Sequence, residues 1–456
     1  MTSLRAPGAI LLVSCYELGR QPTGLAFPMA FLERAGFAPA ALDLAVELLD
    51  EARVRRARLV AVSVPMHTAL RIGVQAAERV RSLNPGATIC FFGLYAVLNR
   101  EYLLEHCADA LLGGESEMQL VALAEALERG EPPASPPPYL ARLAFPVPSR
   151  DRLPAFARYA RLERNGGRVV AGAVEASRGC LHECRHCPIP PVYGGRFFVV
   201  PQDVVLRDIR RQAAAGVGHV TFTDPDFLNG PGHSVRIVEA MHAEFPDLSF
   251  DFTAKVEHLL RHARLLPRLA SAGCAFVVSA IESLSDVVLR NLDKGHTAAD
   301  VQAALDATRS AGVALRPSLL PFTPWTTLDD YVAMLDWAER EDLVEAIDPV
   351  QWSIRLLIPP GSVLLKRPEI KPFLGELRRE DFAWEWTHQD PAMDALHGAV
   401  TQIAQVASRE GASPAGAFAL VRAAAYEAAG RRPAEADATH AERRPVPPRL
   451  TEPWFC

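Results

Sequence analysis

The sequence lacks the features of several protein classes. It has no apolar run of 18 residues and no signal-peptide-like apolar stretch after Met1, which argues against a membrane-spanning helix and against export. Its net charge is only −6, so it has no general positive field for nucleic acid or an anionic membrane. We therefore expect a cytoplasmic protein with no nucleic-acid partner and no membrane partner.

Cysteine is also scarce, with eight residues in a chain of 456. Five of the eight are scattered without a pairing pattern, as expected where thiols stay reduced. The remaining three fall together between residues 180 and 187. The five scattered cysteines are Cys15, Cys90, Cys107, Cys274 and Cys456.

The first 130 residues alternate short apolar strands with helical stretches. The chain is 49% hydrophobic and 22% charged, an ordinary globular composition at a length sufficient for two or three domains. The alternation predicts an α/β domain with a doubly wound parallel sheet. The expected strands are Ile10–Ser14, Ala40–Leu44, Leu59–Val64, Thr88–Phe92 and Ala110–Leu112.

Turn-forming and polar residues follow these strands. In doubly wound sheets ligands bind at the carboxyl ends of the strands, and small residues there let a large ligand approach the backbone. The candidate ligand-binding residues are Ser63, His67, Gly93, Tyr95, Gly114 and Glu115.

The segment 131–150 contains seven prolines and predicts an extended linker between two domains. The predicted division of the chain is an α/β domain at 1–130, the linker at 131–150, a barrel at 151–360, a small helical C-terminal region at 361–430 and a flexible tail at 431–456.

Beyond the linker, strands and helices alternate again and predict a partial, open (β/α)6 barrel. Chemistry in such barrels is placed at the carboxyl ends of the strands. The six expected strands are Val169–Glu175, His219–Thr223, Ser249–Thr253, Ala275–Ala280, Ala314–Leu320 and Val350–Leu356.

Cys180, Cys184 and Cys187 follow the first of these barrel strands. Iron–sulfur clusters normally take four cysteine ligands, so three thiolates on one loop would leave one iron open to a substrate or cofactor. The alternative is a structural zinc site in which His182 or His186 supplies a fourth ligand. The strand–helix repeats that follow favour an enzyme scaffold over a zinc finger.

The spacing Cys180-xxx-Cys184-xx-Cys187 after the first strand of a partial barrel resembles the signature of the radical S-adenosylmethionine (SAM) superfamily. His186 stands where an aromatic residue is usual in that signature. The resemblance implies that the three thiolates bind a 4Fe-4S cluster whose free iron chelates SAM. Reductive cleavage of SAM then yields a 5′-deoxyadenosyl radical.

The same resemblance implies further SAM-binding residues at the strand ends. The expected set is His186, Asp226, Glu282, Ser283 and Arg316. Each has a structural alternative, because an acidic residue at a strand end is often a helix N-cap and Arg316 could equally form a salt bridge.

The N-terminal domain is similar to the cobalamin-binding domains that precede many radical SAM barrels, including the Gly114-Glu115 step. The resemblance implies that the six candidate ligand-binding residues of this domain bind cobalamin. It departs from part of that family because the Asp-x-His-x-x-Gly motif, whose histidine ligates cobalt from below, is absent after the first strand. If cobalamin binds, its lower face is met by water, by nothing, or by another residue, of which His67 is the nearest by type. A cobalamin-free domain is the alternative.

Several longer segments, among them Asp226–His233 and Pro321–Trp325, resemble the radical SAM family named for its CUAEP or CCAEP tail. The sequence stops at Cys456, so the rest of that tail is missing. One hypothesis is that an in-frame selenocysteine codon was interpreted as a stop. Cys456 would then be a redox thiol or, alternatively, an inert terminal residue.

These observations predict a radical SAM enzyme that uses a 4Fe-4S cluster, SAM and cobalamin for methyl transfer to, or rearrangement at, an unactivated carbon. The alternatives are a cobalamin-free, hydrogen-abstracting radical SAM enzyme and a non-catalytic iron–sulfur or zinc protein. The expected partner is an electron donor such as flavodoxin or ferredoxin. The substrate class is left open, because specificity resides in loops.

Overall fold

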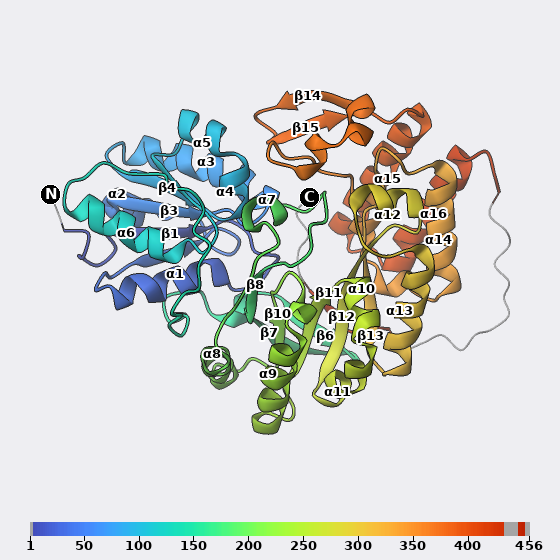
Figure 1. The fold of residues 1–456 in the computed structure, drawn as a ribbon, viewed down its shortest axis with the longest axis horizontal. Coiled ribbons are helices and arrows are strands. Elements are labelled where there is room, and N and C mark those ends of the chain that lie inside the picture. Colours follow the sequence, from blue (N-terminus) through green and yellow to red (C-terminus); the bar gives the residue numbers. More distant parts are fainter. Residues whose placement is uncertain (1–2, 433–445, 452–456) are drawn as a thin grey trace.

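The N-terminal domain is a parallel five-stranded sheet with helices on both faces (Figure 1). The structure is a computed structural model and describes residues 3–432 and 446–451. The strand order β2-β1-β3-β4-β5 is that of a doubly wound sheet, as predicted. The strands are β1 (Ile10–Ser14), β2 (Ala40–Asp43), β3 (Leu59–Ser63), β4 (Thr88–Phe92) and β5 (Ala110–Leu112).

Alternate residues of these strands enter two different cores, because successive side chains of a strand point to opposite faces. Ile10 and Leu12 of β1 pack into the core under α1 and α6, whereas Leu11 and Val13 pack into the core under α3. This two-sided burial explains why the strands are continuous apolar runs. The helices are α1 (Thr23–Arg34), α2 (Glu51–Arg56), α3 (His67–Leu83), α4 (Leu94–Leu98), α5 (Arg100–His106) and α6 (Glu117–Glu128).

The proline-rich segment 131–150, predicted as a linker, contains no helix and contacts the N-terminal sheet. Gly114 forms an isolated parallel bridge with Tyr139 of this segment. A Cβ atom at Gly114 would lie 2.3 Å from the Tyr139 carbonyl oxygen, and Gly114 has a φ of +66°. Glycine is therefore required at this crossing.

The second domain is built on a curled sheet of order β13-β12-β11-β10-β7-β6-β16. Five neighbouring strands are parallel and confirm the partial barrel. The sixth predicted strand, Val350–Leu356, is not a regular strand, since residues Pro349–Ser353 form a 3-10 turn and only Arg355 makes an isolated bridge, to Phe322. The parallel strands are β7 (Gly167–Val174), β10 (His219–Phe222), β11 (Ser249–Ala254), β12 (Cys274–Glu282) and β13 (Ala314–Leu319).

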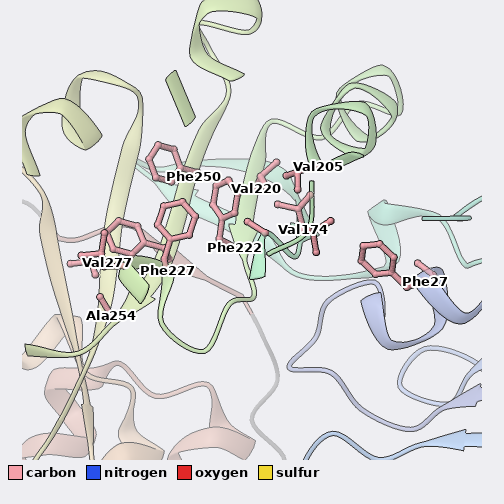
Figure 2. Packing of buried hydrophobic residues seen from close by; sticks show 14 of the residues in the cluster. Phe27, Val174, Val205, Val220, Phe222, Phe227, Phe250, Ala254 and Val277 are labelled. Atoms are coloured by element: carbon pink, nitrogen blue, oxygen red, sulfur yellow. The ribbon is translucent and has the colours of Figure 1, made fainter. Parts of the chain in front are cut away.

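Helices cover the outer face of this sheet, and their apolar side chains meet alternate residues of the strands. Figure 2 shows Val220, Phe222 and Phe250 of β10 and β11 gathered with Phe227. The rings of Phe222 and Phe227 lie 4.5 Å apart between centroids. The helices are α8 (Gln202–Ala214), α9 (Pro231–Glu244), α10 (Val256–Arg261), α11 (Leu266–Ser271), α12 (Asp286–Leu292), α13 (Ala298–Ser310) and α14 (Leu328–Arg340).

The C-terminal region is less uniformly helical than predicted. It contains α15 (Pro391–Glu410) and α16 (Pro414–Ala428), but an antiparallel hairpin of β14 (Leu374–Arg378) and β15 (Ala383–Trp386) precedes them. In the segment predicted as a flexible tail, β16 (Arg449–Leu450) pairs with β6 (Arg161–Arg164) at the sheet edge. Cys456 lies outside the described residues.

Within residues 3–432 and 446–451, no helix combines the length and the apolar character needed to cross a membrane.

Candidate functional site

The cysteine loop, Cys180–Cys187, is held at the carboxyl end of the barrel sheet. The loop begins after β8 (Ser177–Gly179). Because β8 pairs with β9 (Phe197–Val199), the segment between these two strands starts and ends at the same place. Gly179 has a φ of +71°, and a Cβ atom there would lie 2.3 Å from the Arg196 carbonyl oxygen. The turn into Cys180 therefore requires glycine. Asp224, which follows β10, accepts hydrogen bonds from the Ala176 amide and the Ser177 hydroxyl and fixes the start of the loop.

The three thiols are close together and shielded from water. Cys180 and Cys184 are buried and Cys187 is half-buried. Burial raises the pKa of the Cys187 thiol to about 12 and also raises that of Cys180. Buried thiols ionise when a metal binds them, so this donor set fits a cluster of cationic irons. The Asn229 amide, 3.6 Å from the Cys180 sulfur, adds a weak donor of the kind that tunes such clusters.

Both histidines considered as zinc ligands are engaged elsewhere. The Nε2 atom of His182 lies 3.0 Å from Nε2 of His258, and the Nε2 atom of His186 lies 3.4 Å from a carboxylate oxygen of Glu282. A closed Cys3His site would need one of these rings to turn away from its partner. The geometry therefore favours a site with three protein ligands.

Glu282 and Lys294 form a buried ion pair beside the cysteine loop, and the partly buried His186 of that loop lies next to Glu282. The Lys294 ammonium lies 3.1 Å from Glu282. Burial alone would raise the pKa of Glu282, but Lys294 and His186 hold it well below its usual range. Glu282 also has a φ of +66°, a strained backbone for a non-glycine residue. The carboxylate is thus kept charged at the mouth of the barrel, where it can accept hydrogen bonds from a cationic or hydroxylated ligand.

The other three residues predicted to bind SAM, Asp226, Ser283 and Arg316, lie in three different environments. Both oxygens of Asp226 accept backbone hydrogen bonds, from Leu228 and Lys255, and Oδ2 also lies 2.9 Å from Nδ1 of His258. The Ser283 hydroxyl accepts from the Ser285 amide at the start of α12. Arg316 pairs in register with Val278, four residues before Glu282 on β12, and therefore lies roughly 13 Å deeper in the barrel.

A half-open cavity of about 280 Å³ lies between the two domains. We call it the interdomain cavity. Three of the residues predicted to contact cobalamin line it, namely Ser63, Gly93 and Gly114. Its walls are the strand ends of the N-terminal sheet, together with Glu17, Glu117, Met66, Glu175, Arg178, Thr223 and others.

The other three predicted cobalamin residues are not part of this lining. Tyr95 is buried. Glu115 is fully buried and accepts a hydrogen bond from the Tyr193 hydroxyl. His67 donates from Nε2 to the Asp381 carbonyl at 2.7 Å and packs edge-on against Phe382. The cobalt-ligand role suggested for His67 therefore has no support in this arrangement.

The interdomain cavity has features that fit a corrinoid. The Oε2 atom of Glu117 is buried without a hydrogen-bond partner in the described chain, and it would accept a bond from one of the amide side chains of cobalamin. Gly93 has a φ of +110°, and a Cβ atom there would lie 3.0 Å from the Val64 carbonyl oxygen, so glycine is required where this strand end meets the cavity. The enclosed volume holds only part of a corrinoid, so the rest of the ligand would occupy the open side.

A buried charge cluster that the sequence analysis did not predict joins the two domains at this cavity. We call it the interdomain cluster: Arg178 with Glu115, Glu117, Glu175 and Tyr193. The Arg178 guanidinium lies 2.6 Å from Glu117 and 2.7 Å from Glu175. Its Cζ atom also lies 4.9 Å from the ring centres of both Phe27 and Phe145, which pack edge to face against each other. Glu117 begins α6 and looks in sequence like an ordinary first-turn acid, so only tertiary contacts reveal its role.

Buried carboxyl groups around the cavity make the stability of the ligand-free protein sensitive to pH. Burial raises the pKa of Glu17, Glu115 and Asp224 to about 7 each. In the folded state these carboxyl groups keep their protons up to a pH of about 7. In the unfolded state they lose them above the ordinary carboxyl pKa of about 4.5. Stability is therefore fully present below pH about 4.5 and falls as pH rises through about 7.

We expect Glu17→Gln to flatten this pH dependence, because the neutral amide has no proton to lose. The measurement is the denaturant midpoint of the ligand-free protein between pH 4.5 and 8. Glu345→Gln, at a separate surface hollow, is the control and should keep the wild-type slope. An unchanged slope in Glu17→Gln would contradict the assignment.

Comparison with known proteins agrees with this geometry. Residues 174–338 match the family model described as the Radical SAM superfamily. The chain is 25% identical over 326 residues to hopanoid C-3 methylase of Methylococcus capsulatus, covering 67% of this chain and 62% of that protein. It is 24% identical over 357 residues to an uncharacterized methyltransferase of Pyrococcus horikoshii, covering 72% of each. The chain thus spans less than two thirds of the hopanoid methylase.

Two solved structures share the fold. The radical SAM methyltransferase TsrM from Kitasatospora setae, solved with cobalamin and a 4Fe-4S cluster, superposes with a TM-score of 0.59 at 18% identity over 73% of each chain. The cobalamin-dependent radical enzyme OxsB, solved with aqua-cobalamin, gives 0.67 at 15% identity over 88% of this chain and 67% of that one. The α/β architecture of the sheet and curled barrel is therefore shared with both.

Proposed function

We propose that this chain, whose residues 174–338 carry a radical SAM domain, is a cobalamin-dependent radical SAM enzyme that transfers a methyl group to an unactivated carbon or rearranges such a carbon. One observation carries the proposal. The interdomain cavity is walled both by the strand ends of the N-terminal sheet and by Gly179 and Ile189, which flank the cysteine loop. A corrinoid there would lie beside the cluster.

In this proposal the side chains bind and orient the cofactors. Cys180, Cys184 and Cys187 hold a 4Fe-4S cluster, which supplies the electron for SAM cleavage. The Lys294 ammonium lies near the thiols and lowers the cost of their ionisation. Glu282, kept charged by Lys294, serves as the acceptor for SAM at the mouth of the barrel. Ser63, Gly93, Gly114 and Glu117 line the corrinoid site.

Reconstitution with cobalamin tests the proposal directly. Anaerobically purified protein, loaded with iron and sulfide, is expected to retain hydroxocobalamin through gel filtration and to convert SAM under dithionite. We expect Met66→Trp, which fills the interdomain cavity, to weaken cobalamin binding by about tenfold or more while iron content is unchanged. The measurement is the visible spectrum of bound corrinoid against its free concentration.

Leu48→Trp is the matched control, because Leu48 is 92% exposed and lies outside the cavity lining. It should bind cobalamin as the wild type does. SAM cleavage by a protein that retains no corrinoid would favour the cobalamin-free enzyme. Absence of both SAM cleavage and corrinoid binding would favour the non-catalytic protein.

We also propose that flavodoxin or ferredoxin is the electron donor and that the chain belongs to the CUAEP/CCAEP group. All seven cysteines in the described part of the chain are free, which supports work in a reducing cytoplasm with flavodoxin or ferredoxin as the electron donor. Membership in the CUAEP/CCAEP group is supported by the quoted sequence segments alone.

A further inference from the structure

A second cavity, of about 330 Å³, lies inside the curled sheet below the cysteine loop. We call it the barrel cavity. Its apolar walls include Phe276 and Val278, and its polar lining includes Asp251 and Arg316. These residues come from neighbouring strands, because Asp251 is in register with Phe276, and Val278 with Arg316. The cavity thus presents charges of both signs over an apolar floor.

Asp251 is oriented by groups that occupy only one of its oxygens. Its Oδ1 atom accepts from Nε2 of the fully buried His219 at 2.8 Å and from the Thr221 hydroxyl at 2.6 Å. Within the described ranges, its Oδ2 atom accepts no hydrogen bond. Asp251 is 2% exposed, and a buried carboxylate oxygen is stabilised by a hydrogen-bond donor, which Oδ2 lacks among the described residues. A ligand ammonium would supply that donor.

Arg316 offers a complementary positive charge, nearer the carboxyl ends of the strands than Asp251. Its Nη2 atom lies 3.0 Å from Asp348, while its Nη1 atom makes only a long contact of 3.4 Å to the Pro448 carbonyl. A guanidinium has five donors and can hold two carboxylates at once. Its Cζ atom lies 5.8 Å from the centre of the Phe276 ring. Arg316 can therefore bind a ligand carboxylate without giving up Asp348.

We infer that the barrel cavity binds the substrate, and that the substrate is a small zwitterion of the α-amino-acid type. Its ammonium binds Asp251, its carboxylate binds Arg316, and its side chain packs on Phe276 and Val278. The volume is at the lower end of small-molecule pockets, which span roughly 300–1,000 Å³. A fused-ring lipid such as a hopanoid does not suit this size or this charged lining.

The inference rests on the proposed function, because it names the substrate of that site. Leu18, Arg20, Thr223 and Pro225 line both the barrel cavity and the interdomain cavity. The two spaces therefore share a wall, and a ligand in the barrel would lie next to a corrinoid in the neighbouring cavity. That adjacency is what transfer of a methyl group between them requires.

The test measures binding of the twenty proteinogenic L-amino acids to the cluster-loaded protein, by saturation-transfer NMR followed by calorimetry. The strongest binder is then compared with its methyl ester, which lacks the carboxylate, and with its N-acetyl form, which lacks the ammonium. We expect each blocked form to bind at least about tenfold more weakly. No binding by any of the twenty, or equal binding of the blocked forms, overturns the inference.

Two variants separate recognition from mere structural support. Arg316→Gln should abolish the preference for the free acid over its ester, and Asp251→Asn the preference for the free amine over its N-acetyl form. Arg168→Gln, an exposed arginine on β7, is the control and should keep both preferences. Retention of both preferences in Arg316→Gln and Asp251→Asn also overturns the inference.

SAM cleavage under dithionite is measured on the same wild-type samples without amino acid. If cleavage fails while amino acids bind with these preferences, the proposed function is wrong and the ligand assignment stands. If cleavage proceeds but the preferences are absent, the enzyme class stands and the ligand assignment is wrong.

Discussion

Replacing any one of Cys180, Cys184 or Cys187 by Ala is expected to reduce bound iron from about four atoms per chain to near zero. Only three thiolates are available on the loop, so two remaining ligands cannot hold the cluster against water. Burial raises the pKa of Cys187 to about 12, so this thiol stays protonated unless a metal is bound. A weakened cluster therefore loses its iron more readily. Iron and sulfide content, visible absorbance and paramagnetism after reduction measure the effect.

The matched control is Cys107→Ala. Cys107 is a half-buried free cysteine in the N-terminal domain, outside the cysteine loop, and its loss should leave iron content unchanged. A colourless wild-type protein that contains zinc would contradict the cluster, as would full iron retention in a variant of the loop.

Removing the charge of Arg178 is expected to lower the free energy of unfolding by about 3–5 kcal/mol, the cost of leaving buried carboxylates without their cation. The Arg178 guanidinium pairs with Glu115, Glu117 and Glu175. It also spans the two domains, since Glu115 and Glu117 belong to the N-terminal one. Denaturant unfolding of Arg178→Gln measures the loss.

The pH dependence of that loss distinguishes the ionic role from packing. Without Arg178, the carboxyl groups are stable only when protonated, so the deficit should be larger at pH 8 than at pH 5.5. A deficit that is equal at both values would indicate lost contacts with Phe27 and Phe145 instead. Arg129→Gln, which removes an exposed arginine paired with Glu131, should have little effect at either pH.

The three cysteines and Arg178 differ in whether their environment can be recognised from the sequence. The cysteine spacing is local, so a loop that carries three thiols could be recognised from eleven residues, Ser177–Cys187. Arg178 lies in the same segment, but its partners Glu115 and Glu117 are more than sixty residues away. A charged residue next to a motif looks the same in sequence whether it is solvated or buried, and only the docking of the two domains decides which.

Of the residues predicted to bind SAM, some come together beside the cysteine loop and one, Arg316, lies elsewhere. Glu282 and His186 meet because Glu282 ends β12 and His186 belongs to the cysteine loop, and both lie at the carboxyl end of the barrel sheet. Arg316 lies within its strand rather than at its end, and strand alternation directs it into the barrel cavity. The predicted sixth strand, Val350–Leu356, failed for a related reason. An apolar run does not tell whether a neighbouring strand is in place to pair with it.

By itself, the sequence determined the alternation of strands and helices and the three-thiol loop, because each depends on residues close together in the chain. The tertiary structure alone decided which carboxylates share Arg178, which polar atoms line the two cavities, and that His67 donates to the Asp381 carbonyl. The physical reason is that desolvation and charge pairing depend on neighbours that are distant in sequence, and these set ionisation and ligand fit only once the domains have packed.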